Sequence, residues 1–323
     1  MKHNFKITAI LLAMFLITQL IGIYVVNFYS PVKIVEGEKI NVTAPNLPFG
    51  LETPELEEEK DFNYAFVSIL LAFMIAISLL LFLTRLNAEF FLRLWFFLVI
   101  VIALVISFNV FISKTGFLPN NLEFISWNFP ISWAVALAIS FPLAYIKIYK
   151  RDFFVHNMTE LIIYPGIAAV FVPILNIYTV SMLLILISIY DMWAVWHSGI
   201  MQKMAKYQIN KLNIFSGFFV PYMSKKVKMQ MMKMKNSKSK RSSRKKIKVN
   251  IAILGGGDVI FPIITSGVML KTLGFLPALF VIAGATLGLS YLFFFAEKRK
   301  FYPAMPFISA GIFFGILMSY LMF

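Results

Sequence analysis

Nine long apolar stretches constrain the fold of this 323-residue chain more than any other feature of its sequence. They lie at about 6–28, 62–84, 94–112, 128–149, 158–174, 177–197, 249–269, 275–295 and 302–322. A helix needs about 20 apolar residues to cross a bilayer, and it satisfies its own backbone polar groups in lipid. The hydrophobic share of 60% agrees, because soluble domains contain roughly 45 to 50%. We therefore predict an all-α membrane protein with nine transmembrane helices.

The charged residues between these stretches predict how the chain is oriented. Nine crossings place the amino terminus and the loops at 85–93, 147–157, 198–248 and 296–301 on one side, which carries 25 of the 30 Lys and Arg residues. The loop at 29–61, on the other side, carries eight acidic residues and three lysines. Since basic loops tend to stay in the cytoplasm, the amino terminus is predicted to be cytoplasmic and the carboxyl terminus external.

This topology divides the chain into three parts. Residues 1–197 hold helices 1 to 6 and the external acidic loop, 198–248 form a cytoplasmic basic loop that is largely disordered, and 249–323 hold helices 7 to 9. Within the basic loop, 225–248 is of low complexity and has almost no apolar pattern, which is typical of disorder. No aromatic residues are interleaved with these charges, so we expect contact with the lipid bilayer and no nucleic-acid partner.

The residue types that are missing exclude several catalytic chemistries. The chain has no cysteine, which rules out thiol nucleophiles and cysteine metal sites, and its three dispersed histidines form no HExxH zinc motif. No GxSxG sequence is present for a serine nucleophile. We expect neither a metal nor a cofactor, and we place His156 and His197 in solvent at the cytoplasmic boundary.

Three acids fall inside or at the edge of the predicted helices, where an ionised carboxylate is costly. Glu160 lies in the first turn of the fifth stretch, where the helix dipole and nearby headgroups favour an anion, so we give it a structural role. Asp191 and Asp258 lie roughly 10 to 14 Å from the cytoplasmic boundary, counted along consecutive antiparallel helices. Their equal depth allows the two side chains to face each other.

Two carboxylates that share a site of low dielectric cannot both ionise, so such a pair holds one proton. The ionised member can deprotonate a water while the protonated member donates to a peptide carbonyl, which is aspartic-protease chemistry. Paired acids inside a membrane also serve as proton relays, so a proton-coupled transporter or channel is the alternative.

The residues around Asp258 favour an open site. Gly255, Gly256 and Gly257 are costly inside a helix, and their lack of side chains lets another backbone or water approach. Pro262 removes a backbone donor from the same predicted helix and would kink it.

Three short motifs carry a resemblance that covers the whole predicted layout. Tyr190-Asp191 lies in the sixth stretch, Gly255 to Asp258 in the seventh, and Pro303-Ala304-Met305-Pro306 opens the ninth. Their order and placement resemble the YD, GxGD and PAL signatures of the presenilin and signal peptide peptidase family. A second match to PAL, Pro277-Ala278-Leu279, lies toward the external face, about 25 Å or more from the acids by helical rise. We therefore assign the third motif to 303–305, where Met305 replaces Leu with similar volume and polarity.

The resemblance implies a presenilin-like fold and an intramembrane aspartyl endopeptidase with Asp191 and Asp258 as its catalytic pair. It also implies that Tyr190, the three glycines and Pro303, Ala304 and Met305 shape the site for substrates, which are transmembrane helices or residual membrane peptides. The basic loop resembles presenilin, which favours substrates with an external amino terminus, whereas the sequence from Asp258 to Pro262 resembles signal peptide peptidase. We expect a multi-pass protein of the cell membrane. A homo-oligomer stays open, and nothing in the sequence requires an accessory subunit.

Overall fold

The structure is a computed structural model of the chain. It describes residues 5–35, 38–42, 44–51, 56, 58–86, 88–115, 130–150, 152–198, 216–222, 250–295 and 302–322. Within the loop 198–248, predicted to be largely disordered, the structure describes a strand at Gly217–Tyr222, whereas 225–248 lies outside the described residues.

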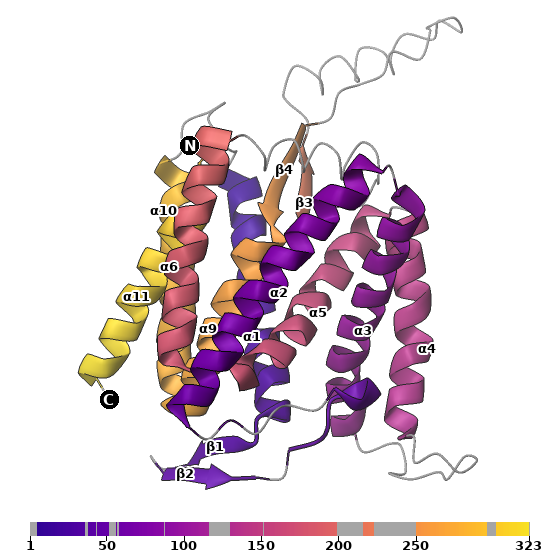
Figure 1. The fold of residues 1–323 in the computed structure, drawn as a ribbon. Coiled ribbons are helices and arrows are strands. Elements are labelled where there is room, and N and C mark those ends of the chain that lie inside the picture. The colour runs from indigo at the N-terminus through magenta and orange to yellow at the C-terminus, as the bar shows by residue number, and fades with distance from the viewer. Residues whose placement is uncertain are drawn as a thin grey trace, which may run out of the picture.

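Helices make up most of the described part of the chain, which contains nine α-helices (Figure 1). They are α1 (Phe5–Tyr29), α2 (Glu59–Arg85), α3 (Glu89–Thr115), α4 (Ile131–Tyr145), α5 (Phe153–Phe171), α6 (Ile177–Trp193), α9 (Gly256–Thr272), α10 (Phe275–Phe295) and α11 (Met305–Met322). Single π turns extend α4 through Lys150 and α6 through Ser198, and a 3-10 turn follows α5 at Val172–Ile174. Counted together with these turns, eight of the nine are long and apolar enough to cross a membrane, and the exception is α9, whose 17 residues have no such extension. The chain is therefore a multi-pass membrane protein, and the cytoplasmic position of its amino terminus stays a prediction.

Two antiparallel hairpins interrupt the helical pattern. β1 (Val32–Val35) pairs with β2 (Glu38–Asn41), and β3 (Gly217–Tyr222) pairs with β4 (Asn250–Gly255). The prediction that a helix begins at 249 is thus wrong, because 250–255 is a strand and the helix begins at Gly256. A short apolar run bounded by glycine fits a buried strand as well as a buried helix, so its periodicity could not separate the two.

Helix α9 lies at the centre of the bundle. Helices α1, α5, α6, α10 and α11 all pack against it. The approach of α1 is close, since a Cβ on Gly22 would lie 2.4 Å from Cγ2 of Ile263. The Gln19 side chain on α1 also donates from Nε2 to the backbone oxygen of Val259, at 3.0 Å. These contacts fix the position of the helix that carries Asp258.

The two hairpins lie at opposite ends of the bundle, as Figure 1 shows. Helix α9 starts at β4 and ends near β1, where a Cβ on Gly274 would lie 3.5 Å from Cγ2 of Ile34. Seventeen residues at about 1.5 Å each make α9 about 25 Å long. The β3–β4 end and the β1–β2 end are therefore well separated.

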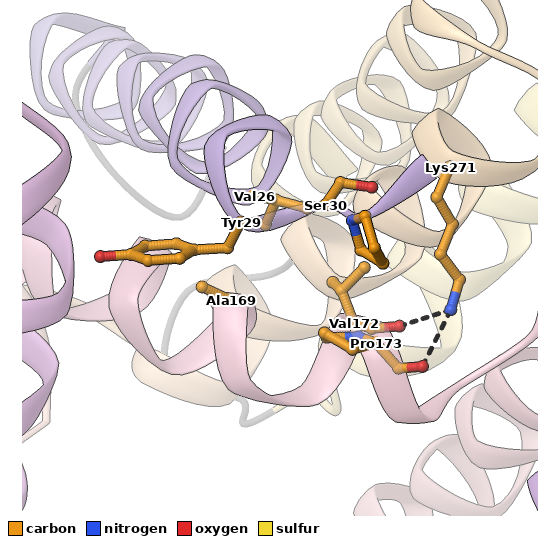
Figure 2. A pocket seen from close by; sticks show the side chains of 8 residues that line it. Val26, Tyr29, Ser30, Ala169, Val172, Pro173 and Lys271 are labelled. Carbon is orange, nitrogen blue, oxygen red and sulfur yellow. Dashed lines mark hydrogen bonds between the residues drawn. The ribbon is translucent and has the colours of Figure 1, made fainter. Parts of the chain in front are cut away.

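A small cavity marks the β1–β2 end. Its volume is about 10 Å³, close to that of one water, and it is lined by Val26, Tyr29, Ser30, Pro31, Ala169, Val172, Pro173 and Lys271 (Figure 2). Lys271, in the last turn of α9, donates from Nζ to the backbone oxygens of Val172 at 2.8 Å and Pro173 at 3.1 Å. Those carbonyls follow the end of α5, so the lysine stabilises a helix terminus. We assign a structural role to the β1–β2 end of the bundle.

Candidate active site

Asp191 lies near the end of α6 and is 7% exposed. Its Oδ2 accepts a hydrogen bond from the backbone N–H of Met305, the first residue of α11, at 3.1 Å. One turn away, the Ser188 hydroxyl donates to the Ser309 hydroxyl at 2.9 Å and joins the same two helices. The unpaired amides of a helix start favour an anion, so α11 holds the Asp191 carboxylate at its amino-terminal end.

Asp258 lies in the first turn of α9 and is partly buried. Gly255 is the residue that caps this helix, and its backbone hydrogen-bonds the Asp258 carboxylate. An acid at the third helical position commonly reaches back to its cap residue in this way. Helix α6 packs against α9, and Asp191 lies within electrostatic range of Asp258. The structure thus brings together the two acids that the sequence placed at equal depth.

The three glycines before Asp258 have different surroundings. A Cβ on Gly256 would lie 2.6 Å from Oγ of Ser216 and 2.9 Å from the hydroxyl oxygen of Tyr164. A Cβ on Gly255 would lie 3.1 Å from Oδ2 of Asp258. Gly257 is exposed, and the nearest atom to its Cβ position is 3.8 Å away on Phe261. Packing therefore requires glycine at 256, the carboxylate crowds 255, and only 257 borders open space.

We expect Gly256→Ala to lower the thermal unfolding temperature while Gly257→Ala leaves it unchanged. Tyr164 is fully buried and cannot move away from an added methyl group, and such overpacking costs about 1 to 3 kcal/mol. Thermal unfolding of the two purified variants, followed by circular dichroism, measures the difference. Equal unfolding temperatures for both variants would contradict the close packing at Gly256.

The structure separates the two candidates for the third motif. The backbone of Met305 contacts Asp191, and Pro303 and Ala304 immediately precede α11, with Pro303 buried. Pro277 to Leu279 instead lie in the first turns of α10, just after Gly274 at the β1–β2 end. The choice of 303–305 on grounds of depth therefore agrees with the geometry.

Tyr190 is only a neighbour of the acid in sequence. Its side chain is 43% exposed, and its ring centroid lies 6.3 Å from that of Trp193. No contact among the described residues joins its side chain to Asp191 or Asp258. Its expected role in shaping the substrate site stays a prediction.

A buried polar cluster beside β3 was missed by the sequence analysis. Glu160 is 1% exposed and binds Nζ of Lys147 through Oε1 at 2.5 Å, and His156 is 8% exposed with Nε2 at 2.8 Å from the backbone oxygen of Gly217. Placing His156 in solvent was therefore wrong, because β3 covers this face of α5. Placing Glu160 in the first turn was also wrong, because the helix already begins at Phe153. The i, i+4 spacing of His156 and Glu160 was the available signal.

The described part of the chain contains no candidate metal site. There, no three His, Asp or Glu side chains gather closely enough to hold an ion. The groups at this site are the two carboxylates of Asp191 and Asp258, the backbone N–H of Met305 and the exposed backbone at Gly257. Those groups suffice for acid and base catalysis on a peptide carbonyl.

The family of this chain follows from a comparison with known family models. Residues 40–323 match a family model described as signal-peptide peptidase, presenilin aspartyl protease. The chain belongs to this family. As a presenilin-family protein it is an aspartic endopeptidase that acts within a membrane, and the transporter alternative gains no support.

Solved structures of presenilin-family proteins share the fold. One, a presenilin family intramembrane aspartate protease in the C222 crystal form, is 18% identical with a TM-score of 0.57, covering 98% of this chain and 99% of its own. A second, of a presenilin family intramembrane aspartate protease in the P2 form, is 18% identical with a TM-score of 0.55, covering 97% of both chains. A search of curated proteins gave no match. The presenilin-like fold predicted from the motifs is therefore confirmed over nearly the whole chain.

Proposed function

We propose that Asp191 and Asp258 are the catalytic pair that hydrolyses peptide bonds within transmembrane helices or residual membrane peptides. The observation that carries the proposal is the approach of two buried or partly buried acids from adjacent helices in a protein of an aspartyl protease family. One carboxylate takes a proton from water as the water attacks the peptide carbon, and the other donates a proton to the carbonyl oxygen. In the second half the protonated carboxyl donates to the leaving nitrogen and the C–N bond breaks, while the other carboxylate takes a proton from a hydroxyl of the gem-diol. The products are a carboxylic acid and an amine, and the pair returns to its single-proton state.

Met305 orients this pair. Its backbone N–H holds Oδ2 of Asp191, and the backbone of Ala304 also hydrogen-bonds that carboxylate. Pro303 and Ala304 immediately precede α11, and Gly257 borders open space on the side of Asp258. We assign these residues, with Tyr190, Gly255 and Gly256, to the wall of the substrate site.

The β3–β4 sheet has an open edge that could bind a substrate in an extended conformation. A helical peptide bond is shielded by its own hydrogen bonds, so the substrate must become extended before hydrolysis. Ile253 lies opposite Phe219, whose backbone N–H and oxygen bond Asn157 and not β4. The backbone polar groups of Ile253 therefore face the other edge of the sheet. No described residue bonds the Ile253 backbone on that edge, and its side chain is 40% exposed. A substrate strand added there would lead to Asp258 five residues later.

The substrate class follows from this geometry. We propose single-span helices and residual membrane peptides, cleaved near the end of the bundle that carries β3 and β4, in the cell membrane. Neither a homo-oligomer nor an accessory subunit is needed for the chemistry, since one chain supplies both acids.

A transition-state isostere tests the proposal. In vesicles, the purified protein should cleave a synthetic single-span peptide, and the same peptide with a hydroxyethylene group at the scissile bond should inhibit cleavage. The hydroxyl mimics the tetrahedral intermediate, so inhibition should be at least about 10²-fold stronger than by a matched methylene analogue. Mass spectrometry of the products measures the rate. No product, or equal inhibition by both analogues, would refute the acid pair as the catalytic site.

A further inference from the structure

We infer that His156, Asn157 and Glu160 on α5 form a positioning device, the α5 clamp, which holds β3 and thereby places Asp258 and keeps substrate strands on β4. The inference rests on the proposed function for its catalytic consequence. Its structural part rests on contacts between α5 and β3 alone.

The side chains of the α5 clamp bond the backbone of β3 where a neighbouring strand would otherwise do so. Oδ1 of Asn157 accepts from the backbone N–H of Phe219 at 2.9 Å, and Nδ2 donates to the backbone oxygen of the same residue at 2.8 Å. Gly217 is held in the same way, with its oxygen 2.8 Å from Nε2 of His156 and its N–H 3.4 Å from Oε1 of Glu160. Four backbone groups of β3 thus have side-chain partners where a further strand would supply backbone ones.

These contacts close the outer edge of β3. Gly217, Phe219 and Pro221 alternate along the strand, so their backbone polar groups point to one edge. The α5 clamp occupies the first two, and the third is a proline with no N–H to offer. An incoming strand therefore finds no ladder on β3 and is directed to Ile253 on β4.

The α5 clamp also has the support that a positioning group needs. Glu160 is paired with Lys147, and the two side chains are 1% and 3% exposed. The ring of His156 packs on that of Phe219, with centroids 4.8 Å apart. Buried ionic groups of this kind are held in one arrangement because either charge alone would be strongly unfavourable.

A direct chain of contacts leads from the α5 clamp to the acid. A two-stranded hairpin is marginally stable by itself, so β4 depends on what anchors β3. Gly217 pairs with Gly255, and the Gly256 N–H donates to the Ser216 oxygen at 3.3 Å. Tyr164, one turn beyond Glu160 on α5, approaches Gly256 directly. A shift of β3 would therefore move Asp258.

The test compares Asn157→Leu and the milder His156→Phe with Asn63→Leu, which makes the same change on the exposed side of α2. Active sites are titrated with the hydroxyethylene peptide, so that only folded, competent protein is counted. Per titrated site, we expect Asn157→Leu to lower kcat by about 10²-fold with KM little changed, since a misplacement of about 1 Å has that effect. His156→Phe should be intermediate and Asn63→Leu unchanged.

Substrate register supplies a second readout. N-methylation of single peptide bonds in the substrate should block cleavage by the wild type at every second position, because alternate N–H groups face β4. In Asn157→Leu this alternation should weaken and extra cleavage sites should appear. An unchanged kcat per titrated site, together with the wild-type alternation, would overturn the α5 clamp as a positioning device.

Amide hydrogen exchange separates the two proposals. The Phe218 to Val220 amides should lose protection in Asn157→Leu and keep it in Asn63→Leu, whether or not any peptide is cleaved. If the wild type cleaves nothing, the proposed function fails, and unchanged protection in Asn157→Leu would independently overturn the α5 clamp.

Discussion

We expect replacement of either Asp191 or Asp258 with asparagine to lower the rate of peptide cleavage by about 10³-fold or more. Each acid performs a proton transfer that an amide cannot perform, and general acid or base catalysis contributes about 10² to 10⁴-fold. In the proposed mechanism the two carboxylates share one proton, so neither can take over both transfers. The double variant should therefore be little slower than either single variant. Quantified peptide products from the vesicle assay give the three rates.

Glu89→Gln is the matched control for these variants. Glu89 lies 36% exposed at the start of α3 and pairs with Arg93 at 3.7 Å, far from the candidate site in the chain. Losing an exposed pair of this kind costs only about 0.3 to 0.5 kcal/mol, so its rate should match the wild type. Cleavage that persists at the wild-type rate in Asp191→Asn or Asp258→Asn would show that another group carries out hydrolysis.

Gly311→Leu should destabilise the protein and remove its activity together. Helices α10 and α11 meet through two GxxxG pairs, Gly284 with Gly288 and Gly311 with Gly315. A Cβ on Gly311 would lie 2.1 Å from the backbone oxygen of Gly284, and the reverse distance is also 2.1 Å. Backbone cannot give way as a side chain can, so the two helices must separate. The start of α11, which holds Asp191 through Met305, would then move.

Ala310→Leu, which adds a similar volume on an exposed position of the same helix, is the control. We expect Gly311→Leu to lose at least about 3 kcal/mol of unfolding free energy, the upper end for overpacking a well-packed site. Denaturant unfolding in detergent, followed by circular dichroism, measures the difference. Similar stability of the two variants would mean that the glycine contact does not hold α10 to α11.

The helical bundle and the approach of the two acids could be predicted because both depend only on the number of residues in each apolar stretch. Apolar run length gives the helices, and equal depth on antiparallel helices gives the approach of Asp191 and Asp258. The hydropathy of 249–269 could not show that its first residues are a strand, since lipid-compatible strands and helices have the same composition. That decision depends on β3, which lies about 30 residues earlier in the sequence.

The polar cluster on α5 was hidden for a related reason. With a helix predicted from 158, Glu160 has the position of an ordinary helix-start acid, and only the fold reveals that Lys147 and β3 exclude water from it. The three glycines show that a sequence motif does not tell which of its residues is required for packing. A motif names 255, 256 and 257 together, whereas the neighbours of each Cβ position decide which one constrains packing.

The short length of α9 has a consequence for hydration. At about 25 Å it falls short of the roughly 30 Å hydrocarbon core, so we expect β4 to cross the remaining part of the membrane. Unpaired backbone at membrane depth is tolerated only against protein or in a water-filled space. We therefore expect the open edge at Ile253 to be hydrated in the resting enzyme. Water along that edge would supply the reactant for hydrolysis, and an arriving substrate strand would displace part of it toward Asp258.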